Sequence, residues 1–359
     1  MSKKPKNYHE EQNIQNAKKL KEQLAKLPSF CKDFFVSISD NTSSATRCGY
    51  AYDLDIFFSY LCEHEDDFIG ILSVEFTLLD LNKVWISHLE RYMAHLSYYE
   101  RSRAGELGKS TVEHSNKERG KSRKLSAVRG LFSYLFKGEK IAANPTELIV
   151  PPKIHSKNIT RLEVDEVAKL LDEVEAGASL AGRQQAFHEL TKERDLAIVT
   201  LLLGTGIRVS ECVGIDITDL NFDINGVRIL RKGGDESVVY FGDEVREALF
   251  GYLKEREKIV AAAGHENALF LSLRNTRITV RSVQNLVKKY SRTVTPLKNI
   301  SPHKLRSTYG TNLYSETGDI YLVADVLGHK DINTTRKHYA DMADSRRRQA
   351  AKYVVLRKE

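Results

Sequence analysis

The sequence predicts a mainly helical protein of two domains, with one small antiparallel β-sheet in the second domain. Its 359 residues are too many for one typical hydrophobic core, and a content of 41% hydrophobic and 29% charged residues is that of an ordinary globular protein. Apolar residues recur at helical spacing along most of the chain. Prolines interrupt this period between 144 and 152, and two β-rich runs replace it between 226 and 242.

The amino-terminal half is predicted to be all helical. Residues 1–27 are rich in Lys, Glu, Gln and Asn, and they predict a polar extension, either a solvated helix or a flexible lead-in. Residues 28–150 form the first predicted domain. Its clearest helix follows Ser43, which can cap the helix. The apolar face of that helix consists of Tyr50, Leu54, Phe57, Phe58 and Leu61.

Residues 101–124 are predicted to form a long basic loop within the first domain. Basic residues outnumber acidic ones in this stretch, and its apolar content is too low for a packed helix. Another strong helical period begins at Leu125, so we expect the loop to end there.

The second domain is predicted to span residues 161–340. Residues 151–160 form a linker, since the prolines before and within this segment stop the helical pattern. Between 226 and 242, two β-rich runs flank a Gly-Gly turn, which is the pattern of a hairpin. Residues 341–359 follow as a carboxyl-terminal tail.

Charge and cysteine usage narrow the class of protein. A net charge of +7 and a pI near 9.0 make a polyanion a plausible partner. No apolar run approaches the roughly 20 residues that span a bilayer, and the amino terminus has no secretory pattern. The four cysteines are scattered without CxxC spacing, which favours reduced thiols in a cytoplasmic protein.

Five short elements of the second half need a joint explanation. Each one alone is common, because an arginine near a glutamate, an HxxR pair or a single tyrosine usually has a structural role. The five are GTGIRVSE at 204–211, the hairpin lysine Lys232, SPHKLRSTYGTNL at 301–313, VLGHKDINTT at 326–335 and KHYAD at 337–341.

In this order and spacing, the five elements resemble the catalytic domain of tyrosine recombinases, the family of Xer proteins and of phage and transposon integrases. The resemblance covers nearly the whole chain. It implies a two-domain DNA clamp, in which residues 28–150 form a helical core-DNA-binding domain and residues 161–340 form the catalytic domain. It also implies an enzyme that cuts and rejoins DNA strands.

The resemblance implies a catalytic set consisting of Arg208, Lys232, His303, Arg306, His329 and Tyr339. Tyr339 would attack the scissile phosphorus, because a phenol gives a covalent and reversible link. The two arginines would neutralise charge on the non-bridging oxygens, and the two histidines would donate hydrogen bonds or carry a proton. Lys232 would protonate the departing 5′ oxygen. No metal or cofactor is expected, and the sequence has no ATP-binding loop or HExxH pattern.

Two positions depart from the common family pattern. The nucleophile usually lies nine residues after the histidine of the LGH box, where this chain has His338, and Tyr339 lies at ten. We favour Tyr339, with a shift of one residue at a helix start or bulge. In the hairpin, Asp235 and Glu236 replace the basic residues of many relatives, so Arg231 is an alternative phosphate contact beside Lys232.

The expected partner is double-stranded DNA with a specific short recombination site. A homotetramer on DNA follows from the need for four active sites around one junction, and residues 341–359 would dock on a neighbouring subunit or lie on their own domain. Residues 101–124 would contact DNA or stay solvated, and an accessory DNA-bending or directionality protein is possible. Integration or excision of a mobile element is the preferred role. The alternatives are Xer-type chromosome-dimer resolution, a type IB topoisomerase-like activity, and a regulator without catalysis.

Overall fold

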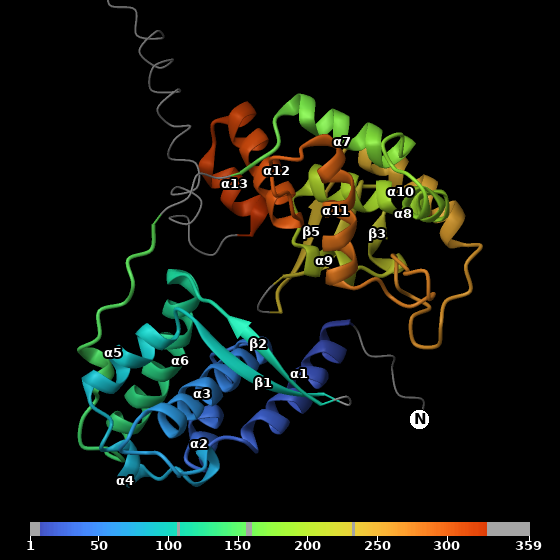
Figure 1. The fold of residues 1–359 in the computed structure, drawn as a ribbon. Helices are drawn as coiled ribbons and strands as arrows, with labels where there is room; N and C mark the ends of the chain where they lie inside the picture. Colours follow the sequence, from blue (N-terminus) through green and yellow to red (C-terminus); the bar gives the residue numbers. More distant parts are fainter. Residues whose placement is uncertain (1–7, 106–107, 156–159, 232–233, 329–359) are drawn as a thin grey trace, which may run out of the picture. The chain divides into compact units, whose positions relative to one another are not determined.

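The computed structural model describes residues 8–105, 108–155, 160–231 and 234–328, with side chains described outside 102–110. The chain divides into two compact units, Met1–Ser156 and Lys157–Glu359 (Figure 1). Both units are mainly helical and carry small antiparallel sheets, which confirms the predicted fold class.

In the first unit, helices surround an aromatic core. The sequence forms these helices because large apolar side chains recur at helical spacing and stack against one another across the unit: Phe57 of α3, for example, contacts Tyr92 and Phe132 edge-on. Ser43 caps α3 as predicted, since its side chain accepts a hydrogen bond from the backbone N–H of Thr46. The elements are α1 (Tyr8–Leu24), α2 (Cys31–Ser37), α3 (Ser44–His64), η1 (Ser73–Glu75), α4 (Leu78–Leu81), α5 (Ile86–His95), β1 (Tyr99–Gly105), β2 (Gly108–His114), α6 (Glu118–Lys137) and η2 (Pro145–Glu147).

The first of these helices, α1, packs on the unit and is therefore more than a solvated lead-in. Leu20 and Leu24 lie against the aromatic core, although neither is fully buried. Asn16 donates a hydrogen bond to the Ser44 hydroxyl at the start of α3, with 3.0 Å between nitrogen and oxygen. The polar composition of residues 1–27 does not predict these contacts, because only one side of α1 packs against the rest of the first unit.

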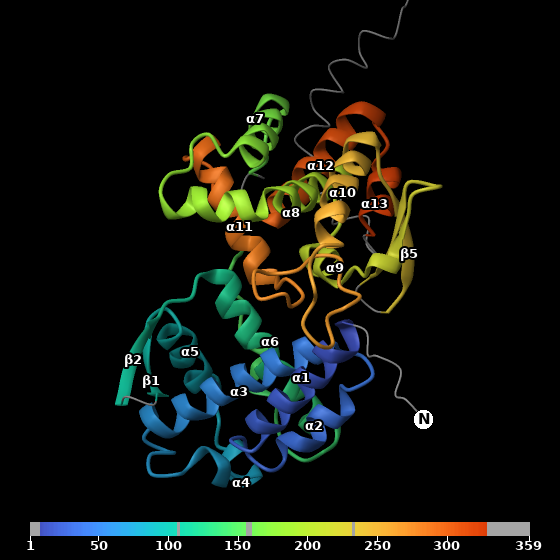
Figure 2. The same cartoon turned by 90° about the vertical axis from the view of Figure 1, so that its right-hand side faces the viewer.

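The prediction of a long basic loop at 101–124 is wrong. The prediction that the first half is all helical is also wrong, since this segment contains two strands. Tyr99–Gly105 and Gly108–His114 pair as an antiparallel hairpin, with Tyr99 opposite His114 and Gly105 opposite Gly108 (Figure 2). Backbone pairing holds this hairpin, which is why its low apolar content gave no sign of it. The buried ring of Tyr99 stacks between His95 and His114 and fixes the base of the hairpin to α5.

Helix α6 begins at Glu118, earlier than predicted, and its basic side chains at 123 and 124 lie against a carboxylate of α3. Asp53 is fully buried and accepts two hydrogen bonds from Arg123, at 2.5 and 2.8 Å. Lys124 lies 4.0 Å from the same carboxylate. Burial raises the pKa of Asp53, and the nearby Arg123 and Lys124 oppose that rise. In β1, Arg101 pairs with Asp55 in the same way. These three basic residues are therefore part of the packing of the first unit.

In the second unit, the central helix α8 packs against α7, α10 and α12. The predicted hairpin is confirmed: β4 and β5 pair antiparallel, with Gly226 opposite Tyr240 and Leu230 opposite Glu236. The elements are α7 (Val164–Ala176), α8 (Arg183–Thr205), α9 (Val209–Gly214), η3 (Ile217–Asp219), β3 (Leu220–Asn221), β4 (Gly226–Leu230), β5 (Glu236–Tyr240), α10 (Asp243–Arg256), α11 (Val280–Val294), α12 (Pro302–Thr317) and α13 (Ile320–Leu327).

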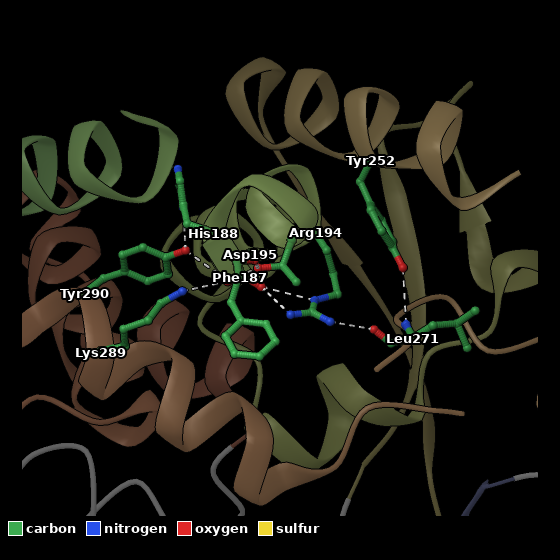
Figure 3. Close-up of polar contacts among 9 residues, drawn as sticks. Phe187, His188, Arg194, Asp195, Tyr252, Leu271, Lys289 and Tyr290 are labelled. Carbon is green, nitrogen blue, oxygen red and sulfur yellow. Dashed lines mark hydrogen bonds and ion pairs between the residues drawn. The ribbon is translucent and has the colours of Figure 1, made fainter. Parts of the chain in front are cut away.

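A buried polar network joins α8 to α11 and to the segment before α11 (Figure 3). The carboxylate of Asp195 accepts a hydrogen bond from the Tyr290 hydroxyl at 3.0 Å and pairs with Arg194 at 2.7 Å. Arg194 also donates to the carbonyl of Leu271, and the ring nitrogen Nδ1 of His188 lies 3.0 Å from the Tyr290 oxygen. Buried polar groups that are paired in this way fix one arrangement of helices.

We expect Tyr290 to make the folded state sensitive to alkali. Burial, and after it the charge of Asp195, raises the pKa of Tyr290 well above its ordinary value of 10.0. Above about pH 10 the unfolded chain loses this proton while the folded chain keeps it, so stability that is present below pH 10 falls as the pH rises. Urea unfolding of Tyr290→Phe should show a shallower loss of stability than the parent between about pH 9 and pH 11.

The matched control is Tyr240→Phe, because Tyr240 is exposed on β5 of the same unit. This variant should keep the slope of the parent chain. Equal slopes for Tyr290→Phe and the parent would show that Tyr290 ionises with the same ease in both states.

Candidate active site

A tight turn between α8 and α9 positions Arg208. Gly206 ends α8 in the left-handed region at φ 63°, and a Cβ there would lie 2.4 Å from a ring carbon of Tyr309, so only glycine fits. Arg208 is the N-cap residue of α9, and its backbone N–H donates to Glu211 at 2.7 Å. The Arg208 guanidinium also donates to Glu211, at 2.8 Å. The pairing of Arg208 with Glu211 that the sequence suggests is therefore present.

Helix α12 carries His303 and Arg306 on successive turns. It begins at Pro302, and a proline suits the first helical position because it has no N–H that needs a partner. Arg306 is buried, and one of its nitrogens donates to the carbonyl of Gly206 at 2.7 Å. Its other terminal nitrogen donates to the carbonyl of Leu327. His303, one turn earlier, is exposed.

The carboxyl end of α13 gathers the arginines of the site. This short helix ends at Leu327, and the capping residue after it, Gly328, is left-handed at φ 60°. The last carbonyls of a helix lack partners within it and carry partial negative charge, so they favour cations. Here Arg306 donates to Leu327, and Arg208 donates to Gly328 at 3.3 Å. Two arginines from different helices are thereby brought to consecutive carbonyls.

A third arginine, Arg231, reaches the same helix end from the β4–β5 hairpin. It donates to Val326 at 2.9 Å and to Leu327 at 3.3 Å. It also lies 3.8 Å from the carboxylate of Glu211, and burial lowers the pKa of its guanidinium. The contacts that the structure shows for Arg231 are thus with protein groups. No local pattern could predict them, since the partners lie about a hundred positions along the chain.

Three of the six predicted catalytic residues belong to the described part of the chain. The structure brings Arg208 and Arg306 together at the end of α13 and places His303 on the same helix as Arg306. Lys232, His329 and Tyr339 lie outside the described residues, as do His338 and the tail 341–359.

Comparisons with known proteins identify the family. Residues 160–346, which are 187 of the 359, match the phage integrase family. The tyrosine recombinase XerC of Caldanaerobacter subterraneus subsp. tengcongensis is 31% identical over 342 residues, which cover 93% of this chain and 89% of that protein. The chain belongs to the phage integrase family of tyrosine recombinases. This recombinase is also 30% identical to XerD of Staphylococcus haemolyticus, over 72% of the chain and 83% of that protein.

Solved recombinase structures share the fold. XerH bound to palindromic difH substrate, in a post-cleavage complex, matches with a TM-score of 0.64 and 20% identity over 94% of this chain and 88% of that one. The Tn1549 transposon integrase in complex with circular intermediate DNA matches with a TM-score of 0.58 and 19% identity, over 87% and 95% of the two chains. Both neighbours are two-domain tyrosine recombinases, as the sequence predicts for this one.

Tyrosine recombinases cleave and rejoin DNA, and the arginine cluster of this recombinase suits that chemistry. A guanidinium carries five N–H groups in a rigid plane, so contacts with backbone carbonyls fix where the plane faces. Charge that develops on phosphate oxygens is stabilised best by donors that are already oriented. In the described part of the chain, no group of three or more His, Cys, Asp or Glu could hold a metal ion. None of the described helices is both long and apolar enough to cross a membrane.

Proposed function

We propose that this recombinase breaks one DNA strand by attack of Tyr339 on the scissile phosphorus. A bond forms between the phenolic oxygen and phosphorus, and the bond from phosphorus to the 5′ oxygen breaks, which leaves a 3′-phosphotyrosyl link. The phenolic proton passes to a neighbouring histidine, His303 or His329, and Lys232 donates a proton to the leaving 5′ oxygen. The reverse reaction, with the 5′ hydroxyl of a partner strand, rejoins DNA through a Holliday junction.

The observation that carries this proposal is the meeting of Arg208 and Arg306 at the end of α13. The helix that they anchor leads directly into the sequence that holds His329 and, ten residues later, Tyr339. Arg208 and Arg306 come from separate motifs about a hundred residues apart, and the carbonyls at the end of α13 hold both in place. A phosphodiester that binds between these oriented arginines and Tyr339 would use both as donors.

The proposed partner is double-stranded DNA with a short specific site. The first unit, with residues 28–150, would act as the core-binding domain and residues 161–340 as the catalytic domain, the two forming a clamp with most contacts to phosphates. Exchange of two duplexes needs four active sites, so we propose a homotetramer on DNA, held by docking of residues 341–359 on a neighbour. Affinity for the duplex should fall steeply with added salt.

For the biological role, we propose integration or excision of a mobile element. The preference rests on the polar lead-in at 1–27 and on the hairpin at 99–114, which we take to be additions to the two-domain core. A second candidate, Xer-type resolution of chromosome dimers, is favoured by the 31% identity to XerC over nearly the whole chain. An accessory DNA-bending or directionality protein would accompany the first role.

A two-site plasmid assay tests the function. The plasmid carries two copies of the DNA that flanks the gene, and the products of incubation with the full chain are separated by size. Strand exchange gives two circles or an inversion, depending on site orientation. Relaxation of a supercoiled plasmid that has no site would indicate a topoisomerase-like activity instead. DNA binding without any covalent adduct would indicate a regulator.

The same assay separates the two roles when the DNA is varied. Recombination between the ends of an element and a target supports integration or excision. Recombination confined to two copies of one chromosomal site supports the Xer-type role.

A further inference from the structure

Arg231 is the residue at which the β4–β5 hairpin turns. Strand β4 ends at Leu230, and the backbone N–H of Arg231 donates to the carbonyl of Asp235 at 2.8 Å. The N–H of Gly234 donates back to the carbonyl of Arg231 at 3.1 Å. The backbone of Arg231 is therefore part of the hydrogen bonding that closes the turn, and the next residue in the chain is Lys232.

The side chain of Arg231 crosses from this turn to α13. Its exposed fraction is 11%, and its two terminal nitrogens donate to the carbonyls of Val326 and Leu327. The guanidinium also packs on Gly328, since a Cβ at that glycine would lie 3.0 Å from it. Glu211 lies 3.8 Å away and provides the nearby negative charge. One side chain thus fixes the start of the turn to the helix end where Arg208 and Arg306 are held.

We propose that Arg231 is a positioning residue that fixes the start of the hairpin turn against the carboxyl end of α13. In this role it sets the place from which Lys232 protonates the leaving 5′ oxygen, and it does not contact the phosphate itself. The proposal rests on the function proposed above for Lys232. A misplacement of about 1 Å in a reacting group can cost roughly a hundredfold in rate, so the loss of one anchor matters.

Three versions of a nicked suicide duplex distinguish the possible roles of Arg231. The first carries the ordinary 5′ oxygen at the scissile phosphate. In the second, sulfur replaces that bridging oxygen, and because a thiolate leaves without a proton, the duplex no longer needs a general acid. In the third, a methyl group replaces one non-bridging oxygen, and because the resulting methylphosphonate is neutral, it no longer needs full neutralisation by arginine.

With the ordinary duplex, single-turnover formation of the covalent adduct by Arg231→Ala should be slower by roughly a hundredfold. The sulfur-containing duplex should restore most of that rate, and the methylphosphonate should not. Arg231→Lys, which keeps the charge but cannot reach both carbonyls with a planar group, should show a smaller loss and the same rescue by sulfur. Affinity for the duplex should stay within about twofold, since no phosphate contact is lost.

The matched control is Arg228→Ala. Arg228 lies on β4, shortly before Arg231, is half exposed, and pairs with Asp219 at 2.7 Å. This variant should cleave all three duplexes at the rate of the parent chain. A melting temperature of Arg231→Ala close to that of Arg228→Ala would show that the slower cleavage is not a loss of folded protein.

Each outcome is decisive. Rescue of Arg231→Ala by the methylphosphonate would make Arg231 a phosphate contact, and rescue by neither duplex would make it a purely structural residue; both overturn the proposal. Lys232→Ala is measured in parallel. If sulfur fails to rescue Lys232→Ala, the role of Lys232 as general acid is wrong, whatever Arg231 does.

Discussion

Replacing Tyr339 by phenylalanine should abolish the covalent protein–DNA adduct. The variant lacks the oxygen that bonds to phosphorus, so the rate of adduct formation should fall by roughly 10⁴-fold or more, as it does when other covalent enzymes lose their nucleophile. Phenylalanine keeps the aromatic ring and the net charge, so affinity for the duplex should be unchanged. The measurement is adduct formation on a nicked suicide duplex, followed by denaturing electrophoresis, with binding measured separately.

His338→Ala is the control for this experiment, because His338 stands at the spacing that most relatives use. It should still form the adduct. Loss of the adduct in His338→Ala together with its survival in Tyr339→Phe would move the nucleophile to the histidine and remove the shift of one residue.

Arg208→Ala should lose strand cleavage by roughly 10³- to 10⁵-fold, the range seen when phosphoryl-transfer enzymes lose an arginine that faces the transferred group. The effect on folding should be smaller. The Arg208 side chain is 31% exposed, and the carboxylate of Glu211 keeps the backbone N–H of residue 208 and the nearby Arg231 as partners. Single-turnover cleavage at saturating protein measures the rate, and thermal unfolding measures the stability.

The control is Arg183→Ala, at the exposed start of α8, where the guanidinium lies over the ring of Phe187. It removes one positive charge from the same unit and should cleave normally. If Arg183→Ala and Arg208→Ala lose the same amount of activity, the loss reflects net charge and DNA binding, and Arg208 has no special place at the phosphate.

The sequence predicted those parts of the fold whose causes are local. The apolar face that includes Leu54 and Phe57 predicted α3, and the two β-rich runs on either side of the Gly-Gly turn predicted the β4–β5 hairpin. The β1–β2 hairpin could not be predicted from the apolar pattern, because backbone pairing does not require one. The stacking partners of Tyr99 also lie on other elements, His95 on α5 and His114 on β2. Periodicity measures burial along one element and gives no signal for such contacts.

In the candidate active site, too, contacts between residues close in sequence could be predicted and contacts between distant residues could not. The pair formed by Arg208 and Glu211 is three residues apart and could be predicted. The pairing of Arg231 with the end of α13 joins residues about a hundred positions apart, and the sequence left this arginine as a possible phosphate contact. The roles of Lys232, His329 and Tyr339 stay predictions, and the experiments above test them.

The arginines that α13 holds have given up their rotational freedom before any DNA arrives. Ordering a free arginine side chain costs up to about 2 kcal/mol, and in this protein that cost falls on folding and not on each catalytic cycle. In the reaction proposed above, the same rigid donors would face the phosphorus in cleavage and in rejoining. An active site built this way lowers the barrier equally in both directions, so it cannot by itself decide whether exchanged strands or the original ones are sealed.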